Sequence, residues 1–184
     1  LSQIQASQAI KRDPVLVLNS GRLCYQKAPW RFTWLAEHCQ DLAAQFLWLG
    51  SGPLQAETRA SAPDNLSISG WLSADEVTHC LSEAGLFVMT SLWEGMPLAL
   101  IEAQAAGLAA VVLDVPGCRD VVTDGVTGFV CTSEAMLIER VRQLIQDPDL
   151  RQKLGHNAAE IAATRFSLAR FNSELLALYA GSTA

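Results

Sequence analysis

The chain has 184 residues, and half of them are hydrophobic, including five Trp and six Phe, which is typical of one globular domain and not of a disordered protein. Its 13 basic and 19 acidic residues give a formal charge of −6, which argues against nucleic acid as a partner, because proteins that bind it carry a basic face. No apolar run approaches the ~20 residues that a membrane-spanning helix needs.

The first segment, residues 1–12, is polar and is interpreted as a linker or an incoming helix. The chain begins with Leu and not with Met, so we expect a fragment excised from a longer protein. The segment is also too polar to supply the apolar part of a signal peptide.

From residue 15 onward, short apolar runs that predict strands alternate with segments that predict helices. A parallel sheet with helices on both of its faces produces this alternation. One helix start is specific, because Ser73 with Glu76 three residues later forms a capping box. Strands are predicted at 15–18, 46–49, 66–69, 86–89, 110–113 and 128–131, with helices at 29–39, near 53–60, from 73 and from 97.

The helix after the fourth strand is expected to bind an anion at its start. Pro97 suits the first helical position, because the N–H that it lacks would be unpaired there, and Gly107 suits the helix end. Free N–H groups near Leu98 and Ala99 would then point out of the helix start. Carboxylates that can hold hydroxyl groups flank this site at Glu94 and Glu102, so the segment suits a nucleotide-sugar.

The last quarter of the chain changes character. Strand-like runs cease, and three helices are predicted at 134–146, opened by Ser133, at 149–163 and at 168–179. The sequence therefore predicts an α/β domain, a doubly wound parallel sheet of about six strands with a helical C-terminal tail.

Functional side chains gather in the loops that follow the predicted strands. In an open α/β sheet, ligands bind outside the carboxyl ends of the strands, so these loops should meet at one edge of the sheet. In strand order, they contain Arg22 and Lys27, Gly50 and Gly52, Gly70 and Trp71, Ser91 and Glu94, and Gly117 and Asp120.

Glu94 and Glu102, with seven residues between them and with Ala103 and Ala106-Gly107 after them, resemble the E-x7-E motif of retaining glycosyltransferases of family 4. Four further segments resemble the family in the same order along the chain. They are 21–23 with Lys27, 49–54, 69–72, and 116–122 with 124–129. The resemblance covers residues 15 to 180.

This resemblance implies a Rossmann-like fold and makes residues 1–184 a single domain, the C-terminal, donor-binding half of a two-domain GT-B enzyme. Such an enzyme transfers a sugar from a nucleotide-sugar to a glycan or lipid-linked acceptor. The N-terminal acceptor domain is absent, so we expect the isolated domain to be inactive. The family resemblance implies a cytoplasmic protein and leaves open a peripheral position at the inner face of the membrane.

The expected roles follow the path of the donor. Arg22 and Lys27 would neutralise the diphosphate, one as a planar fork and the other as a point charge. Glu94 would position the donor sugar, Glu102 would hold the ribose, and the backbone at Gly70 would read the base. We predict catalytic roles for Glu94, Arg22 and Lys27, and donor contacts for Arg22, Lys27, Gly50, Gly52, Gly70, Trp71, Leu72, Ser91, Glu94, Gly95, Met96, Pro97, Leu98 and Glu102.

No cofactor or metal is expected. The two cations and the helix start would stabilise the charge on the leaving phosphate, and the sequence has no acidic cluster that could bind a metal. UDP or GDP is the expected nucleotide. The five cysteines contain no C-x2-C pair, which excludes the usual zinc and thioredoxin-like patterns, so they are expected to be free thiols in packed surroundings. His38, His79 and His156 belong to no motif.

Some positions depart from the family pattern. Asp120 stands where the family has Glu, while Ala109 and Thr90 stand where it has Pro. Two other functions stay open at this point. One is a non-catalytic nucleotide-binding or regulatory module on the same fold, since fold alone does not fix function. The other is a nucleotide-sugar 2-epimerase of similar architecture, for which the sequence offers no second carboxylate cluster.

Overall fold

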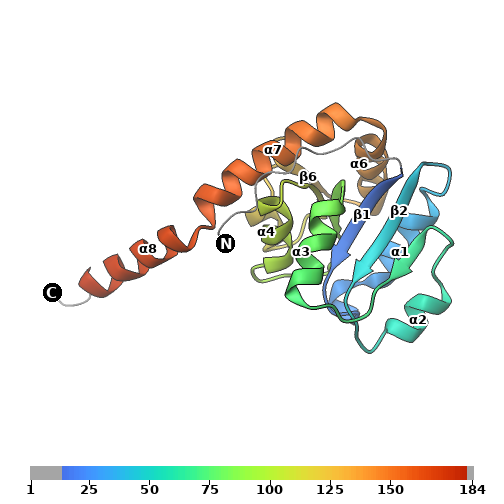
Figure 1. Ribbon diagram of the computed structural model, residues 1–184, viewed down its shortest axis with the longest axis horizontal. Coiled ribbons are helices and arrows are strands. Elements are labelled where there is room, and N and C mark those ends of the chain that lie inside the picture. The colour runs from blue at the N-terminus through green and yellow to red at the C-terminus, as the bar shows by residue number, and fades with distance from the viewer. Residues whose placement is uncertain (1–13, 182–184) are drawn as a thin grey trace.

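A six-stranded sheet, with every strand pairing in parallel fashion, forms the centre of the computed structural model, which describes residues 14–181 (Figure 1). The predicted linker or helix at residues 1–12 lies outside the described residues. The strand order is β3-β2-β1-β4-β5-β6. The strands are β1 (Val15–Ser20), β2 (Ala44–Leu49), β3 (Leu66–Ile68), β4 (Leu86–Met89), β5 (Ala109–Leu113) and β6 (Gly128–Cys131).

Helices connect the strands and form the tail. Because the chain winds outward from β1 to β3 and then returns to place β4 beside β1, the sheet is doubly wound, as predicted. The helices are η1 (Tyr25–Lys27), α1 (Pro29–Glu37), α2 (Gln55–Ala60), α3 (Ala74–Glu83), α4 (Leu98–Ala105), α5 (Cys118–Val121), α6 (Glu134–Gln146), α7 (Pro148–Arg165) and α8 (Leu168–Gly181).

Two apolar cores lie on opposite faces of the sheet, because alternate residues of each strand point to opposite sides. On one face, strand residues such as Val17 and Val111 pack against α1 and α6. On the other face, strand residues such as Leu18 and Val112 pack against α3, α4 and α5. The expectation of helices on both faces is therefore confirmed.

The predicted strands agree with the structure to within two residues at each end, and the three tail helices are present. The capping box at Ser73 and Glu76 is also confirmed, since each side chain accepts a hydrogen bond from the other residue's backbone N–H. The two shortest helices, η1 and α5, were not predicted. Single turns of this kind depend on tertiary contacts more than on sequence period.

One detail of the predicted anion site is wrong. Pro97 is the N-cap of α4 and not its first helical residue. Its carbonyl accepts hydrogen bonds from the N–H groups of Leu100 (3.0 Å) and Ile101 (3.2 Å), which makes Pro97 the residue that begins the hydrogen-bond ladder. The predicted end is confirmed, because Gly107, just after the C-cap residue Ala106, has a positive φ of 83°.

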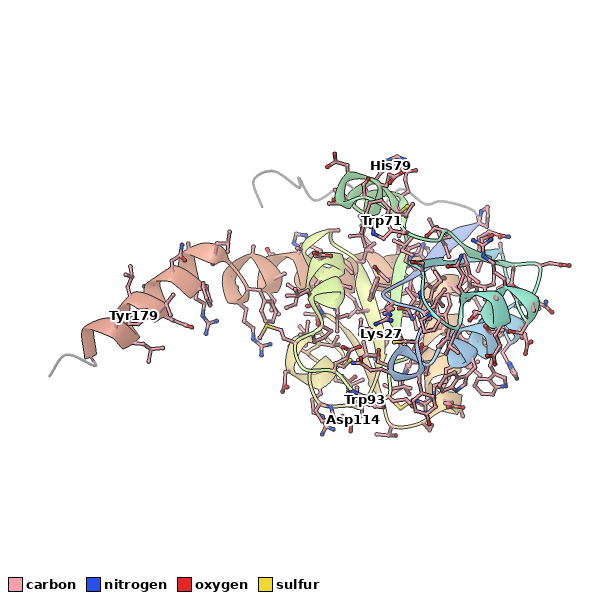
Figure 2. The ribbon with its side chains drawn as sticks, turned by 90° about the horizontal axis from the view of Figure 1, so that it is seen from below. Lys27, Trp71, His79, Trp93, Asp114 and Tyr179 are labelled. Carbon is pink, nitrogen blue, oxygen red and sulfur yellow. The ribbon has the colours of Figure 1, made fainter. Side chains whose placement is uncertain are left out.

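Helix α8 projects from the rest of the domain in both whole-molecule views (Figures 1 and 2). It carries several exposed apolar side chains, which are Leu168, Phe171, Leu175, Leu176, Leu178 and Tyr179. Within residues 14–181, no helix is both long enough and apolar enough to cross a bilayer.

Candidate functional site

The loops with the predicted functional residues meet at the carboxyl edge of the sheet. The parallel pairings of β1 with β2 and of β1 with β4 put the ends of these strands side by side. The point where the strand order reverses lies between β1 and β4, which is the usual ligand position in doubly wound sheets. Figure 2 shows Lys27 between Trp71 and Trp93 in its view of the molecule.

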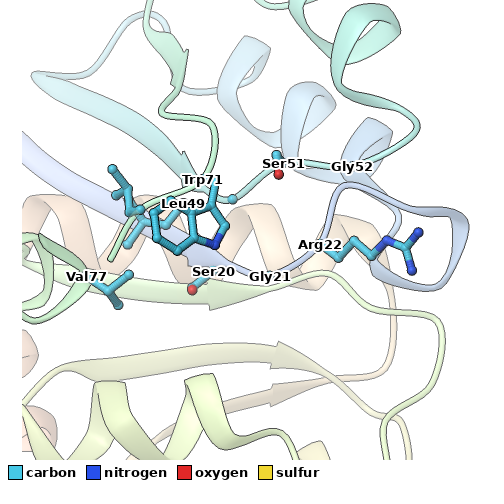
Figure 3. A pocket seen from close by; sticks show the side chains of 10 residues that line it. Ser20, Gly21, Arg22, Leu49, Ser51, Gly52, Trp71 and Val77 are labelled. Carbon is cyan, nitrogen blue, oxygen red and sulfur yellow. The ribbon is translucent and has the colours of Figure 1, made fainter. Parts of the chain in front are cut away.

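One pocket of this edge, with a volume of about 410 Å³, lies over the ends of β1, β2 and β3 (Figure 3). Trp71, which is 77% exposed, lies between Val77 and Arg22 in this view, and the Arg22 guanidinium is directed away from the indole. The pocket therefore joins the predicted base position to a predicted phosphate ligand. It is lined by Ser20, Gly21, Arg22, Leu49, Gly50, Ser51, Gly52, Trp71, Leu72 and Val77.

Glycines let the loops that form this pocket pack directly on one another. A Cβ at Gly50 would overlap the carbonyl oxygen of Gly21, and a Cβ at Gly52 would overlap that of Leu23. The indole N–H of Trp48 also donates to the Gly21 carbonyl at 2.9 Å. In the structure, the close approach that Gly50 and Gly52 permit is between the loops after β1 and β2.

Lys27 and Glu94 form an ion pair at the junction of the loops after β1 and β4. Their Nζ and Oε1 atoms are 2.6 Å apart, and the side chains are only 17% and 6% exposed. A charge-assisted hydrogen bond with so little solvent contact is stronger than one on the open surface. The structure therefore brings together two of the three predicted catalytic residues.

A set of hydrogen bonds holds the turn of Lys27 against the segment of Glu94. The N–H of Leu92 donates to the carbonyl of Gln26 at 2.8 Å, and the Gln26 amide donates back to the carbonyl of Trp93 at 3.0 Å. Gln26 thus clamps the segment before Glu94 with both its backbone and its side chain. Sequence reasoning missed this residue, since a polar side chain in a loop carries no pattern of its own.

Asn19 and Thr90 add a buried connection beneath the same turn. The Asn19 amide donates to Thr90 Oγ1 at 3.3 Å, and that hydroxyl lies 3.2 Å from the carbonyl oxygen of Lys27 and 3.4 Å from that of Ala28. Asn19 Oδ1 and the hydroxyl of Ser91 are buried without a hydrogen-bond partner among the described residues. The signal in the sequence was a polar residue, Asn19, directly after the apolar run 15–18.

Ala28 is the one non-glycine residue with a positive φ, 48°, among the described residues. This conformation turns the chain from η1 into α1 and places Lys27 at the end of the 3-10 turn. An L-residue adopts it at some cost, so the surrounding contacts must hold it in place.

The start of α4 presents the free donors that were expected. The N–H groups of Leu98 and Ala99 have no hydrogen-bond acceptor in the described part of the chain. Leu98 and Met96 are about two-thirds exposed, so this helix start is open to solvent. Glu102 is exposed one turn further along α4, and within residues 14–181 neither it nor Arg22 has an ion-pair partner.

Gly117 and Asp120 make structural contacts within the protein. A Cβ at Gly117, whose φ is 83°, would overlap the carbonyl oxygen of Gly95 and lie 2.9 Å from that of Glu94. The Asp120 carboxylate accepts a hydrogen bond from the Gly117 N–H at 3.2 Å and so caps α5. The close approach of Gly117 is therefore to the Glu94–Gly95 backbone.

The cysteines are free, as expected, and three of them are buried. Cys118 lies close enough to the ion pair to sense both partners. Burial is the main cause that raises the pKa of this thiol to about 12. The negative charge of Glu94 raises its pKa further, and the positive charge of Lys27 lowers it. It is therefore a packed apolar group at neutral pH. No cluster of three or more His, Cys, Asp or Glu side chains suited to a metal ion occurs within residues 14–181.

The profile of a family described as "Glycosyl transferases group 1" matches residues 2–161 of this chain. Among curated proteins, the alpha-D-kanosaminyltransferase of Streptomyces kanamyceticus is 26% identical over 181 residues, which are 91% of this chain and 46% of that protein. The Escherichia coli UDP-Gal:alpha-D-GlcNAc-diphosphoundecaprenol alpha-1,3-galactosyltransferase is 29% identical over 131 residues, 66% of this chain and 33% of that protein. The chain thus spans less than half of each of these relatives.

Solved structures share the fold. S. aureus TarM matches with a TM-score of 0.83 and 22% identity, over 91% of this chain and 35% of that chain. Anabaena HepE, solved in complex with UDP and glucose, matches with a TM-score of 0.83 and 20% identity, over 91% of this chain and 48% of that chain.

Proposed function

The chain belongs to the group 1 glycosyltransferases, and from that membership we propose that it is the donor-binding domain of a retaining enzyme. This enzyme transfers a sugar from a nucleoside diphosphate sugar to a glycan or lipid-linked acceptor. Residues 1–184 would be the C-terminal half of a GT-B enzyme. Their span of 46% of the kanosaminyltransferase is consistent with one of two similar domains.

The observation that carries this proposal is the convergence of three features at one sheet edge. The pocket next to Trp71, the Lys27–Glu94 pair and the open start of α4 all lie on loops that follow strand ends. A nucleotide-sugar has a base, an anionic diphosphate and a polyhydroxylated ring in that order. An apolar pocket, a cationic group with free N–H donors, and a carboxylate match these parts in chemistry.

In the proposed mechanism, the residues of this chain act mainly through charge. As the bond between the sugar and the diphosphate breaks, negative charge grows on the leaving phosphate and positive charge on the ring. Arg22, Lys27 and the α4 start would stabilise the former, and the Glu94 carboxylate would stabilise the latter. Lys27 would exchange part of its contact with Glu94 for the phosphate oxygens, which leaves the carboxylate facing the sugar.

Metal independence is part of the proposal. Two cations and a helix start provide the charge that a divalent ion would otherwise supply to a leaving diphosphate. A chelator should therefore leave nucleotide binding unchanged.

UDP is the nucleotide that we propose to test first, since the HepE structure was solved with UDP. The acceptor would be held mostly by the half of the enzyme outside this chain. The name of the Escherichia coli relative specifies a diphosphoundecaprenol acceptor, which supports a lipid-linked class. We propose a cytoplasmic enzyme at the inner face of the membrane, where such an acceptor is reached.

The test is calorimetric titration of the chain with UDP, GDP and ADP, each with and without a chelator. Glu102→Ala serves as the variant, and it should weaken binding without a change in melting temperature. Its proposed hydrogen bonds to ribose are charge-assisted, each worth about 1.5–3 kcal/mol. If no nucleoside diphosphate binds, or if chelation abolishes binding, the proposal is wrong in that respect.

The alternative, a non-catalytic nucleotide-binding module, predicts the same titration, so a second assay separates the two. The full-length protein should transfer a labelled sugar from the donor to an acceptor. In that assay, Glu94→Gln should lower kcat and kcat/KM equally while diphosphate affinity holds, because the effect of Glu94 would be greatest when positive charge develops on the sugar ring. A full-length protein that binds the donor but transfers nothing would favour the module.

A further inference from the structure

Three exposed aromatic side chains form a cluster beside the Lys27–Glu94 pair. Tyr25, Trp30 and Trp93 are 66%, 43% and 51% exposed. The ring of Tyr25 lies 5.2 Å from that of Trp30 and 6.4 Å from that of Trp93, measured between centroids, and both pairs are tilted. Large aromatic side chains are usually buried, and an exposed group of them marks a binding surface.

The backbone that carries the three aromatic residues is fixed by hydrogen bonds. Tyr25 and Trp93 flank the reciprocal hydrogen bonds of Gln26, which tie the η1 turn to the segment before Glu94. Trp30 is the second residue of α1, which Ala28 connects to that turn. A surface built in this way is preorganised, so a ligand would lose little free energy in ordering it.

The chemistry of the cluster favours a neutral, hydroxylated ligand. The two indole N–H groups and the phenol hydroxyl make no hydrogen bond to any described residue, so they are free to bond a ligand. The basic side chains of η1 and α1 are already paired, Lys27 with Glu94 and Arg31 with Glu134, both at 2.6 Å. A surface for anionic lipid would carry free cations at this position.

We propose that Tyr25, Trp30 and Trp93 bind the pyranose rings of the acceptor glycan. The C–H groups on one face of a pyranose carry partial positive charge and complement the negative face of an aromatic ring. The surrounding hydroxyls would bond the free indole and phenol groups.

The position of the cluster supports the acceptor over the donor. This inference rests on the proposed function, in which the base lies near Trp71 and the diphosphate near Lys27. Trp93 immediately precedes Glu94, and in Figure 2 it lies on the side of Lys27 away from Trp71. The cluster therefore continues the donor path beyond the sugar, where an acceptor must approach.

The indole N–H signals of the five tryptophans, followed by NMR, test the inference on the chain as it exists. Methyl α-D-glucopyranoside and methyl α-D-galactopyranoside are the probes, with sorbitol as the open-chain control and UDP present in excess. We expect the signals of Trp30 and Trp93 to move with a pyranoside and not with sorbitol. Trp34, whose ring lies tilted against that of His38, and buried Trp48 serve as internal controls and should not move.

Tyr25→Ala and Trp93→Phe provide the variants. Each should weaken the affinity for the pyranosides, followed at the Trp30 signal, by about fivefold or more, as loss of an aromatic anchor commonly does. Both should keep the Trp71 response to UDP, which shows that the fold is intact. Silence of Trp30 and Trp93 towards both pyranosides would overturn the inference, as would a response only to phosphatidylglycerol vesicles. Failure of the proposed function would appear separately, as silence of Trp71 towards UDP.

Discussion

At the scale of single residues, the Lys27–Glu94 pair is the feature that the sequence motifs did not reveal. The motifs assigned one residue to the phosphates and the other to the sugar, and the structure shows their charged atoms 2.6 Å apart. The two residues are 67 positions apart in the chain, so only the fold brings them into contact. Such long-range contacts depend on how strands and turns pack, which local patterns do not encode.

Breaking this ion pair on one side should cost stability, because it leaves a largely buried charge without its partner. Lys27→Met and Glu94→Gln should each lower the free energy of unfolding by about 1–3 kcal/mol. The double variant should lose less than the sum of the two. Urea unfolding of all four proteins measures the coupling, and strictly additive losses would show that the pair contributes nothing.

Thr90→Val tests the buried connection under the Lys27 turn. The substitution keeps the shape of the side chain but removes the hydroxyl that accepts from Asn19 and lies within hydrogen-bond distance of the Lys27 carbonyl. We expect a loss of about 1–3 kcal/mol in unfolding free energy, with weaker UDP binding as the turn loosens. Thr78→Val is the matched control, since the Thr78 hydroxyl bonds only within α3. Equal effects of the two variants would contradict this role of Thr90.

At the scale of elements, most of the fold follows from local pattern. Strand runs such as Leu86–Met89 are apolar throughout because both faces of a parallel sheet are covered, and Ser73 with Glu76 fixes a helix start. The functional loops were correctly placed at one edge, because the carboxyl ends of parallel strands lie on the same side of the sheet. The sequence could not predict η1 or α5, nor the exact N-cap of α4, because ends and single turns depend on tertiary contacts.

The glycine in the loop after β5 locks that loop onto the loop after β4, which carries Glu94. Gly117→Ala should therefore cost about 2–4 kcal/mol, from a strained positive φ together with overlap with the Gly95 carbonyl. Gly125→Ala is the control, because Gly125 has a φ of 69° with no neighbouring atom within 4 Å, and it should cost only about 1 kcal/mol. Chemical denaturation compares the two variants. A Gly117→Ala protein as stable as the control would show that the loops do not pack as described.

At the scale of the whole molecule, two cores on opposite sides of one sheet hold the carboxyl edge in place. Buried cysteines report on both cores. Cys39 and Cys131 lie in the core under α1 and α6, and Cys118 lies in the core under α4. Burial is the main cause that raises the pKa of Cys39 to about 11 and the pKa values of Cys118 and Cys131 to about 12.

These three thiols should resist alkylation in the folded protein at pH 8, because that pH lies far below their pKa values and the thiolate is the reactive form. Half-buried Cys24 and Cys80 should react first, and the other three only as denaturant unfolds the domain. Mass spectrometry of iodoacetamide-treated protein follows the order. Uniform labelling of all five under native conditions would mean that the cores are not packed as the structure shows.

The proposed function requires the carboxyl edge to hold a nucleoside diphosphate through Arg22 and Lys27. The most direct measurement compares UDP with uridine in calorimetric titrations of the wild-type chain and of the Arg22→Ala and Lys27→Ala variants. Each variant should weaken UDP binding by about tenfold or more while uridine binding is nearly unchanged, and added salt should weaken UDP binding further. Equal losses for UDP and uridine, or UDP binding that neither substitution affects, would show that Arg22 and Lys27 do not bind the diphosphate.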